Sequence, residues 1–191
     1  MDFLEDLKNA KNKSATVIKH GGVVIFPTDT VYGFLADADN KKAVEKIYKI
    51  KKRPRKKPLP VFIKDLKMAK TLAEISKNQG KIIKKYWPGR YTFVLKAKIK
   101  NPKLVKNGAI ALRVPKYKPL NDLLKKINKP LAQTSANISG QPSLNKITDI
   151  IKIFKNKKNK PDLIVSNGNL PKRKASCIID LTQDKIKYIR K

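Results

Sequence analysis

The stretch VVIFPTDTVYG, residues 23–33, does most to decide the fold of this chain. Its first four residues are apolar, and they predict a buried strand over 23–26 that ends at the following proline. Polar residues come directly after this strand, where open α/β sheets commonly bind their ligands. Thr28, Thr30 and Tyr32 alternate along the segment, so we expect their side chains on one face. The simpler alternative is a polar connection between strands in which Tyr32 is half-buried.

Helical and strand patterns alternate along the rest of the chain. Apolar residues at helical spacing predict helices over residues 2–18, 43–50, 65–75, 77–86, 120–127 and 147–153. Short apolar runs predict strands over residues 59–63, 91–97, 109–114, 130–133, 163–166, 176–181 and 186–189. No internal repeat or clear linker interrupts this order. We therefore expect residues 1–191 to form a single α/β domain with a twisted mixed sheet flanked by helices.

Composition excludes several classes of protein. No apolar run approaches the roughly 20 residues that a membrane-spanning helix needs. The acidic start of the chain, residues 1–6, lacks the features of a signal peptide. One cysteine, Cys177, excludes an internal disulfide, and one histidine, His20, argues against a zinc site. We expect a cytoplasmic protein with no membrane segment and no protein-bound metal.

The net charge of +32 has two interpretations. Forty of the 46 basic residues are lysines, a bias that codon use across a whole proteome can produce. Most of these lysines would then lie on solvated surfaces. The alternative is an electrostatic footprint for RNA, such as a direct contact with tRNA.

The six arginines carry more information than the lysines. An arginine among so many lysines indicates a position that needs a planar guanidinium with several donors. Four of the six lie in or beside the motifs of the chain, namely Arg53, Arg90, Arg113 and Arg190. The other two, Arg55 and Arg173, lie in basic loops and carry no such indication.

Two short segments far apart in the chain predict an anion site. Lys51 and Arg53 place cations on alternate positions before a proline, and Ser135 and Asn137 place a hydroxyl and an amide on alternate positions. Arg53 can hold two phosphate oxygens at once, while Lys51 would add a mobile charge. The hydroxyl and amide would offer neutral donors from one face. Taken singly, the first segment could be the basic end of a helix, and the second could be an ordinary polar turn.

In this order, the segments at 27–33, 51–54 and 134–137, together with Trp87-Pro88-Gly89 and Arg113-Val114-Pro115, resemble the YrdC-like family, the threonylcarbamoyl-AMP synthases of tRNA modification. The resemblance runs from about Gly21 to Arg190. It implies a YrdC-like fold in its short, single-domain form. The extra C-terminal domain of longer relatives would be absent.

The resemblance also implies roles for individual residues. The catalytic signature would be Lys51, Arg53, Ser135 and Asn137. Threonine would be bound by Thr28, Thr30, Tyr32, Arg113 and Ser176, with Arg113 at the amino-acid carboxylate. ATP would be bound by Lys51, Arg53, Lys57, Thr134, Ser135, Asn137 and Arg190. The chain departs from the family where histidine or threonine is usual, at Phe62, Tyr117 and Cys177.

The activity that this resemblance implies is L-threonylcarbamoyladenylate synthesis, a nucleotidyl transfer. A carbamate formed from L-threonine and bicarbonate would attack the α-phosphate of ATP and release pyrophosphate. Mg²⁺ would accompany ATP, held mostly by phosphate and water. A downstream threonylcarbamoyl transferase would use the product for the N6-threonylcarbamoyladenosine (t6A) modification of tRNA. No side-chain nucleophile is needed, which fits the lack of a Ser–His or Cys–His motif.

Three other interpretations stay open at this point. One is a YciO-like paralogue with the same signature and a different substrate. Another is a basic RNA-binding module without catalysis, which predicts steep salt dependence. The third is a carbamoyl-transferring domain of a larger assembly, which the lack of a zinc-finger or acylphosphatase-like segment disfavours.

Overall fold

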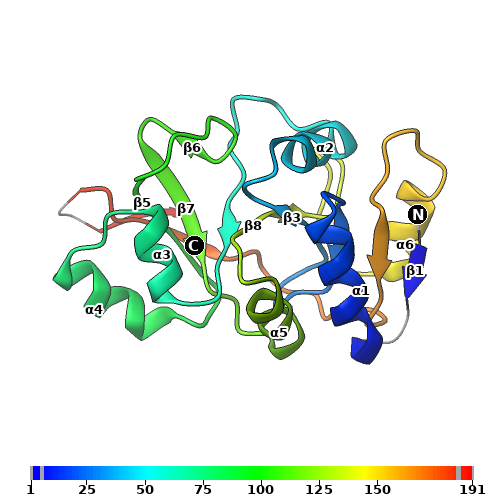
Figure 1. The fold of residues 1–191 in the computed structure, drawn as a ribbon, viewed down its shortest axis with the longest axis horizontal. Helices are drawn as coiled ribbons and strands as arrows, with labels where there is room; N and C mark the ends of the chain where they lie inside the picture. The colour runs from blue at the N-terminus through cyan, green and yellow to red at the C-terminus, as the bar shows by residue number, and fades with distance from the viewer. Residues whose placement is uncertain (1, 5–6, 184–185, 191) are drawn as a thin grey trace.

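The computed structural model describes residues 2–4, 7–183 and 186–190, which form six helices and an 11-stranded sheet (Figure 1). The helices are α1 (Leu7–Lys19), α2 (Lys41–Lys51), α3 (Leu66–Leu72), α4 (Lys77–Tyr86), α5 (Lys118–Ile127) and α6 (Ile147–Phe154). The strands are β1 (Asp2–Leu4), β2 (Val24–Phe26), β3 (Gly33–Asp37), β4 (Val61–Phe62), β5 (Tyr91–Lys96), β6 (Val105–Lys106), β7 (Ala109–Arg113), β8 (Leu131–Ser135), β9 (Leu163–Val165), β10 (Cys177–Asp180) and β11 (Lys187–Arg190). Within these ranges, no helix has the length and apolar character needed to cross a membrane.

The sheet is mixed, and strands far apart in the chain lie side by side. Its order is β1-β9-β2-β3-β8-β4-β7-β5-β10-β11, and β6 pairs with β7 off this path. The parallel pairs are β1 with β9, β2 with β9, β4 with β7 and β5 with β10, whereas the other neighbours are antiparallel. The predicted α/β fold with a mixed sheet flanked by helices is confirmed.

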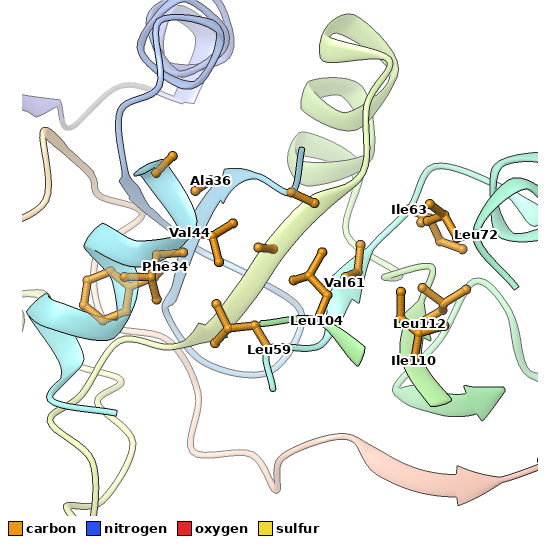
Figure 2. Close-up of a cluster of buried hydrophobic side chains, with 14 of the residues drawn as sticks. Phe34, Ala36, Val44, Leu59, Val61, Ile63, Leu72, Leu104, Ile110 and Leu112 are labelled. Atoms are coloured by element: carbon orange, nitrogen blue, oxygen red, sulfur yellow. The ribbon is translucent and has the colours of Figure 1, made fainter. Parts of the chain in front are cut away.

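Helices cover both faces of the sheet. On one face, α1 and α5 share a core with β2, β4, β8 and β9 that includes Phe26 and Phe62. On the other face, α2, α3, α4 and α6 surround a larger core, part of which Figure 2 shows with Phe34 and Val61 labelled. Val61 and Phe62 are neighbours on β4 and belong to different cores, as alternation along a strand requires.

The start of the chain differs from the predicted helix over 2–18. Residues 2–4 form the edge strand β1, which places Phe3 opposite Ile164 of β9, and the helix begins only at Leu7. Helical spacing at the start of the chain also fits a short strand followed by a helix. Pairing with a distant strand decides between these possibilities, and local spacing does not contain that information.

Strands β3 and β6 lie outside the sequence-based expectation. β3 occupies the middle of the sheet and is buried along its whole length. Its sequence GFLAD contains glycine, alanine and aspartate, which are uncommon in strands. Burial on both faces also removes the polar alternation that marks a half-exposed strand. The segment therefore resembles a connection until its neighbours β2 and β8 are known.

Candidate active site

A cavity of about 640 Å³ lies where the ends of α2 and β8 approach β7, β5 and β10. Phe93 and Ile179 pair side by side in the larger core, so Thr92 and Ile178, one position earlier on each strand, face the opposite side of the sheet. Both of these residues line the cavity. It is also lined by ten residues expected from the sequence: Thr30, Lys51, Arg53, Lys57, Arg113, Thr134, Ser135, Asn137, Ser176 and Arg190.

Lys51 is the last residue of α2, and its buried side chain ends beside β8. Its Nζ donates to the carbonyl oxygens of Ser135 at 2.7 Å and of Asn137 at 3.0 Å, and to Asn137 Oδ1 at 2.6 Å. These acceptors match the three protons of an ammonium group. The residue is only 3% exposed. The mobile charge expected at this position is therefore fixed, and Lys51 clamps the Ser135–Asn137 segment to the end of α2.

Burial lowers the pKa of Lys51 to about 7, and the neighbouring guanidinium of Arg53 adds to this effect. The three acceptor oxygens favour the protonated form and act in the opposite direction. Lys51 is thus close to the balance between charged and neutral at neutral pH. An anion entering the cavity would favour the ammonium form.

The Ser135–Asn137 segment is held together by its own side chains. Ser135 Oγ donates to Asn137 Oδ1 at 2.6 Å, so both side chains lie on the same side, as the alternate spacing predicts. The amide nitrogen of Asn137 donates to the carbonyl oxygens of Ile138 at 3.0 Å and of Gln141 at 2.5 Å. Asn137 therefore shapes the cavity wall, while the Ser135 hydroxyl keeps acceptor capacity toward the cavity.

Arg53 uses part of its guanidinium to hold the turn that follows it. Nε donates to the carbonyl oxygen of Lys57 and Nη2 to that of Pro58, both at 2.9 Å. Burial lowers the pKa of Arg53. Arg53 also lines the cavity, as does Lys57, whose side chain is exposed. The two bonds to Lys57 and Pro58 use a planar group with several donors, which is what an arginine indicates in a chain where most basic residues are lysines.

Arg55 is more than a solvated loop cation, contrary to the sequence-based expectation. Both terminal nitrogens bond the carboxylate of Glu45, and the guanidinium lies 5.7 Å from the centre of the Tyr48 ring. Its side chain is still 62% exposed, and it does not line the cavity. Arg55 therefore remains a surface cation, although a paired one.

The segment after β2 is a turn in which the hydroxyls of Thr28 and Thr30 lie 3.1 Å apart, so these two side chains share one side as expected, whereas the Tyr32 hydroxyl bonds elsewhere, at Gly168. Thr28 Oγ1 accepts from the backbone N–H groups of Thr30 and Val31 and donates to the Val31 carbonyl at 2.6 Å. This local bonding bends the chain, which leaves Thr30 in the cavity wall and Thr28 behind it. Tyr32 is fully buried, contrary to the half-buried alternative, and its hydroxyl donates to the Gly168 carbonyl at 2.6 Å.

Arg113 is paired with a carboxylate of the chain itself. Its Nη2 lies 2.6 Å from both carboxylate oxygens of Asp29, and Nε donates to the Gly89 carbonyl at 3.0 Å. The guanidinium also lies 5.6 Å from the centre of the Phe62 ring. Desolvation lowers the pKa of Arg113, while Asp29 counteracts this effect. Since Arg113 lines the cavity, the pair presents guanidinium donors to it from a buried position.

Ser176 and Arg190 also line the cavity and contact each other. Ser176 Oγ lies 3.0 Å from Thr92 Oγ1 across the boundary between β10 and β5. Arg190 donates from Nε at 2.9 Å and from Nη2 at 2.6 Å to the Ser176 carbonyl. The arginine near the end of the chain is therefore tied to the site through β11.

Several cavity residues escaped the sequence-based predictions, among them Thr92, Gln133, Ser139 and Ser143. Thr92 becomes recognisable only when β5 is known to pair with β10. Asp29 supports the site from behind, and a signal for it was available: it stands inside the decisive stretch 23–33 of a chain with only 14 acidic residues. Across the described ranges, no group of three or more His, Cys, Asp or Glu side chains could hold a metal ion.

Comparison with known sequences gives consistent results. The family model of Sua5, YciO and YrdC, described as telomere recombination, matches residues 16–191. A Methanocaldococcus jannaschii relative is 38% identical over 173 residues, which cover 91% of this chain and 81% of the relative. A Pyrococcus abyssi relative named threonylcarbamoyl-AMP synthase is 34% identical over 173 residues, which cover 89% of this chain and 50% of the relative.

Comparison with solved structures agrees. The crystal structure of P. abyssi Sua5 complexed with L-threonine matches with a TM-score of 0.88 and 29% identity, covering 99% of this chain and 56% of that one. The crystal structure of Escherichia coli YciO matches with a TM-score of 0.87 and 25% identity, covering 100% of this chain and 94% of that one. This chain thus spans about half the length of the P. abyssi protein. From sequence and fold together, the chain belongs to the Sua5/YciO/YrdC family.

Proposed function

We propose that this protein is an L-threonylcarbamoyladenylate synthase, a nucleotidyltransferase acting on L-threonine, bicarbonate and ATP. The observation that carries the proposal is the clamp of Lys51 on Ser135 and Asn137, on the wall of a cavity that also presents Arg53 and Arg113. Lys51 and Arg53, which suit phosphates, and Arg113, which suits a carboxylate, thus line the same cavity. The name of the P. abyssi relative and its threonine complex support the same activity.

The proposed reaction needs positioning and charge rather than a side-chain nucleophile. The amine of threonine bonds to the carbon of bicarbonate, water is lost, and a carbamate forms. A carbamate oxygen then bonds to the α-phosphorus of ATP as the bond from that phosphorus to the bridging oxygen breaks. Pyrophosphate leaves, and threonylcarbamoyl-AMP remains. Fixed cations around a partly enclosed cavity favour such a step, because they need not reorganise as charge moves.

We assign the ATP end of the cavity to the side of α2 and β8. Arg53 and Lys57 would contact the polyphosphate, and Lys51 would contribute charge from its fixed position. Ser135 would orient a phosphate oxygen by turning its hydroxyl proton from Asn137 Oδ1 to that oxygen, and Asn137 would hold the loop that presents it. Thr134 lines the cavity on this side. Arg190 completes the proposed ATP-binding set from the wall that carries Ser176, where it would contact a part of ATP other than the polyphosphate.

We assign the threonine end to the side of β7 and β10. Arg113 would meet the amino-acid carboxylate, and the hydroxyls of Thr30 and Ser176 would contact the remainder of the amino acid. Thr28 and Tyr32 would act indirectly, because Thr28 holds the turn that carries Thr30 and Tyr32 anchors the next residues to Gly168.

Mg²⁺ would enter with ATP. Among the described residues that line the cavity there is no carboxylate, so phosphate oxygens and water would supply most of its ligands. The chain would act as one domain in the cytoplasm and pass its labile product to a threonylcarbamoyl transferase that makes t6A in tRNA. The high positive charge would favour a contact with tRNA at low salt.

The experiment that tests this function is a pyrophosphate-release assay with single omissions. We expect release from ATP when L-threonine, bicarbonate and Mg²⁺ are all present, and a return to background when any one is left out. Equal release without an amino acid would contradict the assignment.

A second candidate, a YciO-like paralogue, is favoured by one observation. The YciO and P. abyssi Sua5 structures match the fold of this chain almost equally well, with TM-scores of 0.87 and 0.88. A panel of amino acids in the same assay separates the two functions. Preference for L-threonine over L-serine supports the synthase, whereas ATP turnover with another amino acid and none with threonine supports the paralogue.

A further inference from the structure

Asp29 is a buried carboxylate to which neither the sequence signature nor the proposed mechanism gives a role. It is 6% exposed and lies directly behind the cavity wall. Both of its oxygens lie 2.6 Å from Nη2 of Arg113, and one also accepts from the backbone N–H of Lys116 at 3.1 Å. An ion pair this deeply buried is costly to form unless its geometry is well satisfied.

The contacts of Asp29 leave a defined part of Arg113 for the cavity. Nη2 faces Asp29 and Nε faces the Gly89 carbonyl, so two sides of the guanidinium are held. The ring of Phe62 lies against its plane. The guanidinium is therefore fixed in position and orientation, and the side that lines the cavity belongs to a rigid group.

Asp29 also connects the loops around this end of the cavity. Its backbone carbonyl accepts from Nη1 of Arg173 at 3.1 Å, which ties the turn at residue 29 to the basic segment 172–175. Ala175 of that segment and Ser176 line the cavity. Arg173, which carried no functional indication in the sequence, therefore braces the backbone that presents Asp29.

The charge balance at this end depends on Asp29. Arg90 and Arg190 are close enough for their charges to act on Arg113, and Arg173 contacts the backbone of Asp29, so four arginines gather here. Asp29 offsets one positive charge at the centre of this group. At the other end of the cavity, Lys51 and Arg53 have no carboxylate among their described contacts. The two ends thus differ in how strongly they attract a multiply charged anion.

We propose that Asp29 is the positioning residue for Arg113: it aims the guanidinium at a single carboxylate and keeps polyphosphate away from this end of the cavity. The inference rests on the proposed function, because it takes the ligand of Arg113 to be the carboxylate of an amino acid. It extends that function by naming Asp29 as the residue that decides which end of the cavity takes threonine and which end takes ATP.

The test is the kinetics of Asp29→Asn, with Asp122→Asn as the matched control. Asp122 forms an exposed ion pair with Lys118 away from the cavity. For Asp29→Asn we expect the KM for threonine to rise on the order of 10²-fold, as for a misplaced binding group, while the KM for ATP changes little. Pyrophosphate, which should compete only with ATP in the parent protein, should also compete with threonine in this variant. The control should keep both patterns.

A double-mutant cycle separates positioning from a merely structural role. If Asp29 acts through Arg113, then adding Asp29→Asn to Arg113→Gln should leave the threonine KM where Arg113→Gln alone puts it. Thermal unfolding of the parent, the two single variants and the double variant shows whether each is folded. If Asp29→Asn alone does not fold, the threonine KM of the double variant is still compared with that of Arg113→Gln.

The outcomes are distinct. An unchanged threonine KM in folded Asp29→Asn, or a further large rise when it is added to Arg113→Gln, would overturn the inference and leave the synthase activity standing. A parent protein that releases no pyrophosphate with threonine would instead remove the proposed function itself.

Discussion

At the scale of single residues, Arg53 and Arg55 form a natural comparison. Arg53 spans two backbone carbonyls and reaches the cavity, whereas Arg55 is a surface cation paired with Glu45. Arg53→Lys should lower kcat/KM for ATP on the order of a hundredfold, about 3 kcal/mol, because a lysine cannot replace an oriented group of donors.

Arg55→Lys keeps a surface ion pair of small value and should leave the kinetics nearly unchanged. Steady-state kinetics of the two variants provides the check. Equal losses in both would show that the shape of the Arg53 side chain is unimportant.

The buried ammonium of Lys51 leads to a pH-dependent prediction. Its pKa of about 7 lies below the ordinary value of 10.5, so at pH 8 the group is largely neutral before ATP binds. The polyphosphate favours the charged form and raises the pKa, so binding should take up a proton. The affinity for ATP should fall as pH rises above 7, at most tenfold per pH unit.

Calorimetry of ATP binding at pH 8, in two buffers with different ionisation enthalpies, measures this proton. Lys51→Met, checked for folding, should lose the uptake. Equal uptake in the variant and the parent would assign the proton to another group.

Residue types could be predicted from the sequence better than their contacts. The sequence pattern identified four residues that line the same cavity, namely Lys51, Arg53, Ser135 and Asn137. It did not indicate that Lys51 is clamped, because that depends on the carbonyl oxygens of a distant loop. The sequence could have singled out Asp29 as a rare acidic residue in the stretch 23–33, but its partner Arg113 becomes known only when the fold brings β7 to that turn.

At the scale of elements, helix α2 brings Lys51 to the end of the cavity that we propose binds ATP. Its first turn is capped by Asn40, whose side chain accepts from the N–H groups of Lys42 and Ala43 at 3.0 Å each. Asn40→Ala should lower the free energy of unfolding by about 1 kcal/mol, and Asn40→Gly by roughly a few tenths, because glycine is tolerated at this position.

Chemical denaturation of the two variants measures this difference. Activity per folded molecule should stay close to the parent value, because the cap lies at the opposite end of α2 from Lys51. A larger loss for glycine than for alanine would argue against capping as the role of Asn40.

The helices were easier to predict than the strands. The patterns for α2, α4 and α5 placed each within a few residues of its observed bounds, because an amphipathic helix shows its buried face in local spacing. Strands β1 and β3 depend on partners elsewhere in the chain, namely β9 for the first and β2 and β8 for the second. Long-range pairing, rather than propensity, makes these segments strands.

At the scale of the whole molecule, the net charge of +32 raises the question of enzyme or RNA-binding module. The double variant Ser135→Ala with Asn137→Ala should abolish adenylate formation and leave any RNA affinity unchanged, because both side chains are neutral and release no counterions. Replacing the exposed lysines 155, 157, 158 and 160 with glutamine should have the reverse effect.

RNA binding titrated against salt, beside pyrophosphate release, measures both effects. The salt slope should fall by about one for each replaced lysine that binds a phosphate in the parent protein. Loss of pyrophosphate release in the lysine variant, with retention in the Ser135/Asn137 variant, would place the active site elsewhere.

The most direct test of the central claim is the identity of the adenylate made from isotopically labelled bicarbonate. The protein is incubated with ATP, Mg²⁺, L-threonine and the label, and the product is analysed by mass spectrometry. We predict threonylcarbamoyl-AMP that carries the label in its carbamoyl carbon, formed together with pyrophosphate. Threonyl-AMP without the label, or no adenylate from a folded protein, would contradict the account.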